Sequence, residues 1–88
     1  MFHLVFVIDQ NAASIEFLKT ELETGITFAN LALSARHEDR LERTKANARK
    51  AHDTAVKFMD KLKLEEAAGL DSLVKDLRSK LRDLGESV

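Results

Sequence analysis

The sequence has no cysteine, no proline, no tryptophan and no tyrosine, and it contains only three glycines. The lack of cysteine excludes disulfide bonds, thiolate catalysis and zinc–thiolate sites. Small extracellular domains commonly depend on disulfides, so we expect an intracellular, cytoplasmic protein. No apolar run approaches the ~20 residues that a membrane-spanning helix needs. The lack of proline, together with 33% charged residues, is typical of a helical chain.

The length of 88 residues predicts one domain, 1–88. A chain of this size buries only about 60–65% of the surface that its unfolded state exposes, so a monomer would be modestly stable.

Apolar and small side chains recur at steps of three and four residues, which predicts helices at about 11–33, 38–63 and 65–84. The first stripe consists of Ile15, Leu18, Leu22, Gly25, Ile26, Ala29, Ala32 and Leu33. The second consists of Leu41, Thr44, Ala48, Ala51, Ala55, Phe58 and Leu62. The third consists of Ala67, Leu70, Val74, Leu77, Leu81 and Leu84, flanked by Leu73. We therefore predict an all-α fold, in which an antiparallel helical hairpin and a third helix form a three-helix bundle with coiled-coil-like packing.

Small residues indicate how the first two helices meet. Glycine inside a helix costs roughly 1 kcal/mol relative to alanine, so Gly25 needs a structural reason. A chain reversal around 34–38 would set Gly25 and Ala29 near Ala48 and Thr44, where two backbones can approach closely. The residues predicted to pack the hairpin are Gly25, Ala29, Ala48, Ala51 and Ala55.

Charge and capping residues agree with this hairpin. Residues 1–35 carry one Lys against four Asp or Glu, whereas 36–63 carry nine Lys or Arg against five Asp or Glu. An acidic helix would thus lie against a basic one, which adds weak attraction. Ser34 or His37 can cap the second helix, and Glu38 and Asp39 suit the positive end of its dipole.

The third helix has two possible starts. A start at Leu64 or Glu65 keeps its stripe continuous and places Gly69 inside the helix, and we favour it. A start at Asp71, with Gly69 in the preceding turn, is the alternative. Gly85 follows the last residue of the stripe, where a helix-terminating glycine is expected.

The segment 1–9 differs from the rest because seven β-favouring or apolar residues follow one another. It reads as a strand or extended segment, although Val5, Ile8, Ala12 and Ile15 keep a helical rhythm and disorder is the third possibility. No basic region precedes the run, so we do not expect a signal peptide. Apolar surface of this extent on a small domain predicts self-association, with a dimer favoured. The expected oligomer contacts are Phe2, Leu4, Phe6, Ile8, Leu73 and Leu77.

His52 is the one residue that we consider for chemistry. Histidine phosphotransfer domains carry their histidine on a helix of an antiparallel bundle, and Ala51-His52 resembles that setting. Those domains usually have lysine and glycine three and four positions later, where this chain has Ala55 and Val56. No glutamate is followed by histidine three residues on, so the metal-binding pattern of helical bundles is missing. We expect no catalytic residue, no metal and no cofactor.

Basic residues of the second helix form the alternative functional signal. Arg36, Arg40, Arg43 and Lys50 follow one helical face, and Lys45 and Arg49 add charge beside it. Spacing of this kind suits phosphate contacts. No aromatic residue interleaves the cluster for base stacking, and three carboxylates interrupt it.

The sequence therefore predicts a non-enzymatic helical protein–protein interaction or oligomerisation module, whose partner is a second copy or another helical protein. A nucleic-acid-associated protein that uses the basic face is the alternative.

Overall fold

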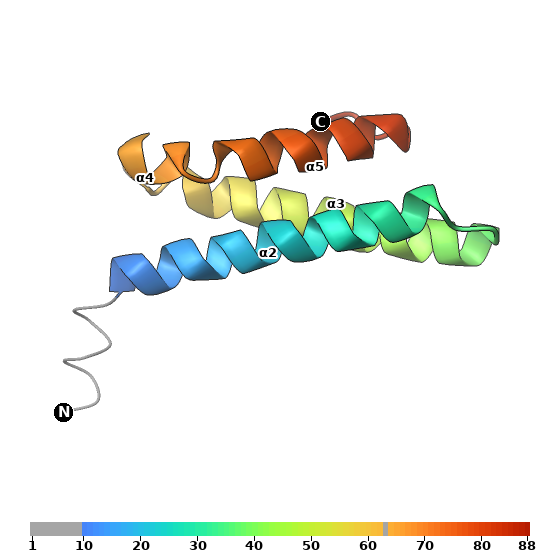
Figure 1. Ribbon diagram of the computed structural model, residues 1–88, viewed down its shortest axis with the longest axis horizontal. Helices are drawn as coiled ribbons and strands as arrows, with labels where there is room; N and C mark the ends of the chain where they lie inside the picture. The colour runs from blue at the N-terminus through green and yellow to red at the C-terminus, as the bar shows by residue number, and fades with distance from the viewer. Residues whose placement is uncertain (1–9, 63) are drawn as a thin grey trace, which may run out of the picture.

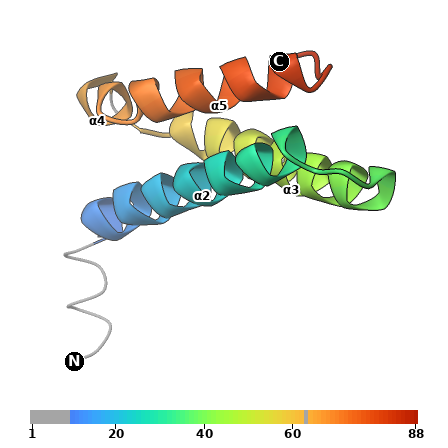
Figure 2. The ribbon, with the colours of Figure 1, turned by 45° about the vertical axis from the view of Figure 1, so that its right-hand side comes forward.

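The computed structural model describes residues 10–62 and 64–88, and these residues form helices connected by short turns, with no strand among them. The helices are α2 (Gln10–Leu33), α3 (Glu38–Met59), α4 (Leu64–Ala68) and α5 (Asp71–Asp83). The long helices α2 and α3 run antiparallel, and α5 lies along one side of this pair (Figures 1 and 2). The predicted all-α three-helix bundle is confirmed.

The reversal between α2 and α3 occupies residues 34–37. The Ser34 hydroxyl donates to the carbonyl of Asn30 at 3.0 Å, so it satisfies an acceptor at the end of α2 rather than capping α3. His37 is the residue before α3 and has extended backbone, but its side chain makes no capping hydrogen bond. Glu38 and Asp39 lie in the first turn of α3, where carboxylates favour the helix dipole.

Gly25 lies where the three long helices meet. A Cβ atom built on it would approach the Leu77 Cδ2 atom of α5 to 2.8 Å and the Ala51 Cβ atom of α3 to 3.0 Å. Both distances are tighter than carbon atoms normally pack, so a larger residue at position 25 would force Leu77 and Ala51 of the two neighbouring helices to shift. The register also differs from the prediction, because Gly25 faces Ala51 rather than Ala48 and Thr44.

The third helical segment does not run continuously from Leu64 or Glu65, so the favoured start was wrong. Helix α4 ends at Ala68, Gly69 and Leu70 form a turn, and α5 begins at Asp71. The amide of Leu70 donates to the carbonyl of Ala67 and closes a tight four-residue turn. Leu70 is buried, whereas Gly69 is exposed. The break thus lets the chain bend at a glycine and place Leu70 in the core.

Helix α3 ends at Met59, four residues before the predicted end at 63. The amides of Lys61 and Leu62 then donate to the carbonyls of Phe58 and Met59, three residues earlier. The backbone after Met59 therefore follows the tighter 3₁₀ hydrogen-bond pattern rather than that of an α-helix. This turn brings Leu62 against the core. Two predicted stripe residues, Phe58 and Leu33, instead expose 43% and 47% of their surface.

Residues of α5 close the core over the hairpin. The fully buried large side chains are Leu18, Leu22, Leu77 and Leu81. All five residues predicted to pack the hairpin are buried as well: Gly25, Ala29, Ala48, Ala51 and Ala55. In the described parts of the chain, no helix is both long and apolar enough to span a membrane.

The end of α5 is fixed by Gly85, which has a φ of 91°. The amide of Glu86 donates to the carbonyl of Leu81 at 2.9 Å, and that of Gly85 donates to the carbonyl of Arg82 at 2.9 Å. These two bonds define a Schellman motif, which needs a left-handed residue. The motif turns the chain back toward α3 at Glu86.

Replacing Ala48 with Leu should destabilise the protein by about 1–3 kcal/mol, because Ala48 is fully buried in the core and the added carbons have no space there. Chemical denaturation monitored by circular dichroism measures the effect. Ala46→Leu is the matched control, since Ala46 lies on the same helix but is exposed. Equal stability of the two variants would contradict the packing described here.

Candidate interaction surface

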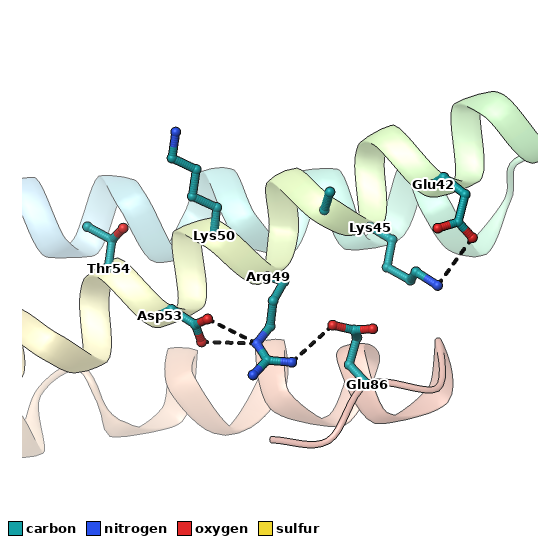
Figure 3. A pocket seen from close by; sticks show the side chains of 8 residues that line it. Glu42, Lys45, Arg49, Lys50, Asp53, Thr54 and Glu86 are labelled. Atoms are coloured by element: carbon teal, nitrogen blue, oxygen red, sulfur yellow. Dashed lines mark hydrogen bonds and ion pairs between the residues drawn. The ribbon is translucent and has the colours of Figure 1, made fainter.

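A chain of polar contacts ties α3 to α5 and to the residues after it. The Arg49 Nε atom donates to both carboxylate oxygens of Asp53, at 3.0 and 3.1 Å. One of its terminal nitrogens donates to Glu86 at 3.0 Å (Figure 3). Because Glu86 follows the Schellman turn, the backbone geometry at Gly85 places this carboxylate beside Arg49.

His52 continues the chain of contacts on the inner side of α3. It is 5% exposed, and its Nδ1 atom lies 2.8 Å from Asp53 Oδ1. The Arg78 Nε atom of α5 donates to His52 Nε2 at 3.1 Å. Since arginine is always a donor, Nε2 must accept and the proton of the neutral ring resides on Nδ1. Both ring nitrogens are engaged within the chain, unlike the accessible histidine that phosphotransfer requires.

The network shifts the pKa values of two of its members. Partial burial acts to raise the pKa of the Asp53 carboxyl, but hydrogen bonds from His52 and Arg49 outweigh it, and the pKa is lowered. Hydrogen bonds to Asp53 and Glu86 raise the pKa of Arg49. Both shifts favour the charged forms that make the contacts.

An open depression of about 550 Å³ lies over this network. It is lined by Glu42, Lys45, Ala46, Arg49, Lys50, Asp53, Thr54 and Glu86. Lys45 pairs with Glu42 at 3.3 Å, and Arg49 pairs with Asp53 and Glu86. Most charged groups of the depression therefore satisfy one another. Among the residues that the structure describes, no group of three or more His, Asp or Glu side chains could hold a metal ion.

The six basic residues proposed as nucleic-acid contacts separate into two sets. Lys45 and Arg49 form ion pairs within the chain on the side of α3 that faces α5. Arg36, Arg40, Arg43 and Lys50 are exposed, and none of them takes part in an ion pair with another residue in the described ranges. Four of the six proposed nucleic-acid contacts therefore remain exposed on the surface.

Three of these cations belong to a larger surface that we call the hairpin face. On α2, residues at steps of four and three share one side: Phe17, Glu21, Thr24, Phe28 and Leu31. On α3, the adjoining stripe consists of Arg40, Arg43, Asn47, Lys50, Thr54 and Phe58. Side chains from both stripes line one groove between the helices. His52, which contacts Arg78 of α5, lies on the opposite side of α3 from this stripe, so the hairpin face points away from α5.

Aromatic side chains form one end of the hairpin face. The rings of Phe17 and Phe58 meet edge to face, with their centroids 6.3 Å apart. They nevertheless expose 51% and 43% of their surface, and Leu31 further along α2 exposes 45%. The Lys61 ammonium lies 5.4 Å from the centroid of the Phe58 ring, an arrangement that favours a cation. The hairpin face therefore runs from an aromatic end to a basic end.

The predicted oligomer contacts require a correction. Leu77 is fully buried against Gly25 within its own chain, so it cannot contact a second copy. Leu73 is half-buried and packs against the same core. Phe2, Leu4, Phe6 and Ile8 lie outside the described residues.

Comparison with known proteins does not assign a function, so a functional proposal rests on this surface. No protein-family model, no curated protein and no solved structure matches the chain.

The tautomer of His52 is a direct test of the polar network. We expect the neutral ring to carry its proton on Nδ1, because Arg78 occupies Nε2. Long-range ¹H–¹⁵N NMR of the histidine ring at neutral pH measures this, and Arg78→Met should shift the ring toward a mixture of tautomers. A proton on Nε2 in the unmodified chain would contradict the contact.

The lowered pKa of Asp53 makes part of the stability dependent on pH. The ionised Asp53 carboxylate stabilises the fold at pH values above the ordinary carboxyl pKa of about 3.9. This stabilisation disappears as the pH falls through the lower pKa of the folded state. Because the Asp53 side chain is 55% exposed, Asp53→Asn should cost only about 0.2–1 kcal/mol at neutral pH. Urea denaturation between pH 7 and pH 3 should show the two curves converging at the acid end. Parallel curves over the whole range would contradict the assignment.

Proposed function

We propose that the chain is a non-enzymatic helical protein–protein interaction module whose docking surface is the hairpin face. The observation that carries the proposal is the exposure of Phe17, Leu31 and Phe58 on one side of the α2–α3 pair. Fully burying a side chain of this size stabilises a complex by about 1.5–3 kcal/mol, so covering three half-exposed ones supplies a useful part of a binding free energy. Phe17 and Phe58 contact each other and give this face an exposed apolar end, a feature that can mark an interaction site.

The structure of the opposite side supports the same choice. There α5 covers the hairpin, Arg49 pairs with Asp53 and Glu86, and Arg78 donates a hydrogen bond to His52. The hairpin face keeps its apolar and basic groups available. A partner can therefore bind this face without displacing α5 or another of the described helices.

A nucleic-acid-associated function is the second candidate, and the exposed cations Arg36, Arg40, Arg43 and Lys50 favour it. Two features of the surface favour a protein instead. The aromatic pair lies at the end of the hairpin face away from the arginines, so it does not interleave the cations as base-stacking platforms do. Asp39 and Glu42 also line a shallow depression together with Arg43.

Photo-crosslinking tests the proposal for a partner of any identity. A benzophenone amino acid replaces Thr24 at the centre of the hairpin face, and the control replaces Ser79, which is exposed on α5. We expect irradiation of the native host cells to give discrete protein adducts from position 24 and not from position 79. Adducts should weaken strongly when Phe17 and Phe58 are both replaced by Ser.

Two results of this experiment would contradict the proposal. One is the lack of any discrete adduct from position 24. The other is an adduct that nuclease treatment removes, which would favour the nucleic-acid function. An adduct of twice the 9.9 kDa mass of the chain would identify the partner as a second copy.

A further inference from the structure

The hairpin face contains a groove with a small-residue floor. Its floor is Ala51, which is buried, and its walls come from both helices. The lining residues are Glu21, Thr24, Phe28, Asn47, Lys50, Ala51 and Thr54, and the space measures about 230 Å³. Threonine and alanine at these positions keep the groove shallow, so it suits side chains that project from a rod rather than an enclosed small molecule.

The charge of the hairpin face is asymmetric. Its two stripes carry Arg40, Arg43 and Lys50 against the single carboxylate of Glu21, with Asp39 and Glu42 beside Arg43 at the edge of the face. All three cations are exposed, and the ion pairs of the described residues leave them without a partner. Lys61 adds a fourth cation above the Phe58 ring. The surface is therefore complementary to a partner that carries carboxylates.

From this combination we propose that the hairpin face binds an acidic amphipathic α-helix, an inference that rests on the interaction function proposed above. Apolar side chains at steps of three and four residues would pack along Phe17, Phe28 and Leu31, which is the helix-in-groove mode of recognition. Carboxylates beside that stripe would pair with Lys50 and, at the far end, with Arg40 and Arg43.

The dimensions of the face set the length of the partner. Phe17 and Leu31 are 14 residues apart on α2, which corresponds to about 21 Å along the helix axis. A bound helix of about four turns covers that distance. The fold already contains an example on the opposite side, where the 13-residue α5 packs on the same hairpin through Val74, Leu77 and Leu81. The complex would thus be a four-helix arrangement with α5 and the partner on opposite sides of α2 and α3.

A second copy of the chain is a poorer occupant. Two hairpin faces packed together would bring two sets of Arg40, Arg43 and Lys50 into one interface with only one Glu21 from each copy. Like charges at an interface cost several kcal/mol unless carboxylates compensate them. An acidic helix removes that cost.

A helix-display selection tests the inference on the full chain. The library presents four-turn helices with leucine fixed at steps of three and four residues, and with the flanking positions randomised among Glu, Lys, Gln and Ser. We expect the selected helices to be rich in Glu. The double variant Arg43→Glu with Lys50→Glu should weaken their binding at least tenfold, and raised salt should weaken binding to the unmodified chain because exposed pairs are screened.

The control variant Lys19→Glu with Lys75→Glu makes the same change in net charge on exposed positions elsewhere on α2 and α5, and we expect it to bind as the unmodified chain does. Circular dichroism checks that both variants fold. Selection of neutral or Lys-rich helices, or equal binding by both variants, would overturn the inference. Binding of a duplex DNA through Arg43 and Lys50, with no binding of a Glu-rich helix, would also overturn the inference. So would dimerisation of the unmodified chain that is lost in the Arg43 and Lys50 variant but kept in the control variant.

These outcomes are separable from failure of the interaction function. Protein adducts at position 24 combined with selection of non-acidic helices refute only the acidic partner. The lack of adducts at position 24 refutes the docking surface itself.

Discussion

The close approach of three helices at Gly25 is the contact on which the rest of the structure depends. A methyl group at this position would lie 3.0 Å from the Ala51 Cβ atom of α3 and 2.8 Å from the Leu77 Cδ2 atom of α5, so both neighbours would have to shift to admit it. An internal glycine destabilises α2 by roughly 1 kcal/mol relative to alanine, and the close packing of the helices offsets this cost. The contact sets the register of the hairpin and fixes α5 on one side of it.

This arrangement gives the two sides of the hairpin different properties. On the α5 side, leucines fill the core and a run of contacts from Arg78 through His52, Asp53 and Arg49 reaches Glu86. On the other side, an alanine and two threonines leave a groove that is flanked by half-exposed aromatic rings and exposed cations. One side therefore stabilises the chain, and the other is available for binding.

The periodic parts of this architecture could be predicted from the sequence. Steps of three and four residues identify the helices, and Gly85 marks the end of α5 because the Schellman turn needs its positive φ. The register could not be predicted, since Ala48, Ala51 and Ala55 are the same size and helical spacing alone does not say which of them lies against Gly25. A leucine stripe likewise does not say whether it packs within the chain or between copies, which is why Leu77 was misassigned.

The candidate site could be predicted only in part. The stripe of Arg40, Arg43 and Lys50 follows from helical spacing alone. The pairing of Arg49 with Glu86 and of His52 with Arg78 could not be foreseen, because the partners lie 37 and 26 residues apart and meet only after α5 docks. The α2 half of the hairpin face was missed as well. Its apolar residues alternate with Glu21 and Thr24, so its periodicity is masked by polar side chains.

The most direct test of the account is to map a bound helix by NMR on the ¹⁵N-labelled chain. A Glu-rich amphipathic peptide of four turns is titrated, and the backbone amide shifts are followed. We expect the largest changes on Thr24, Phe28, Asn47, Lys50 and Thr54, whereas the amides of α5 should change little. Changes concentrated on α5, or no saturable change at the hairpin face, would contradict this expectation.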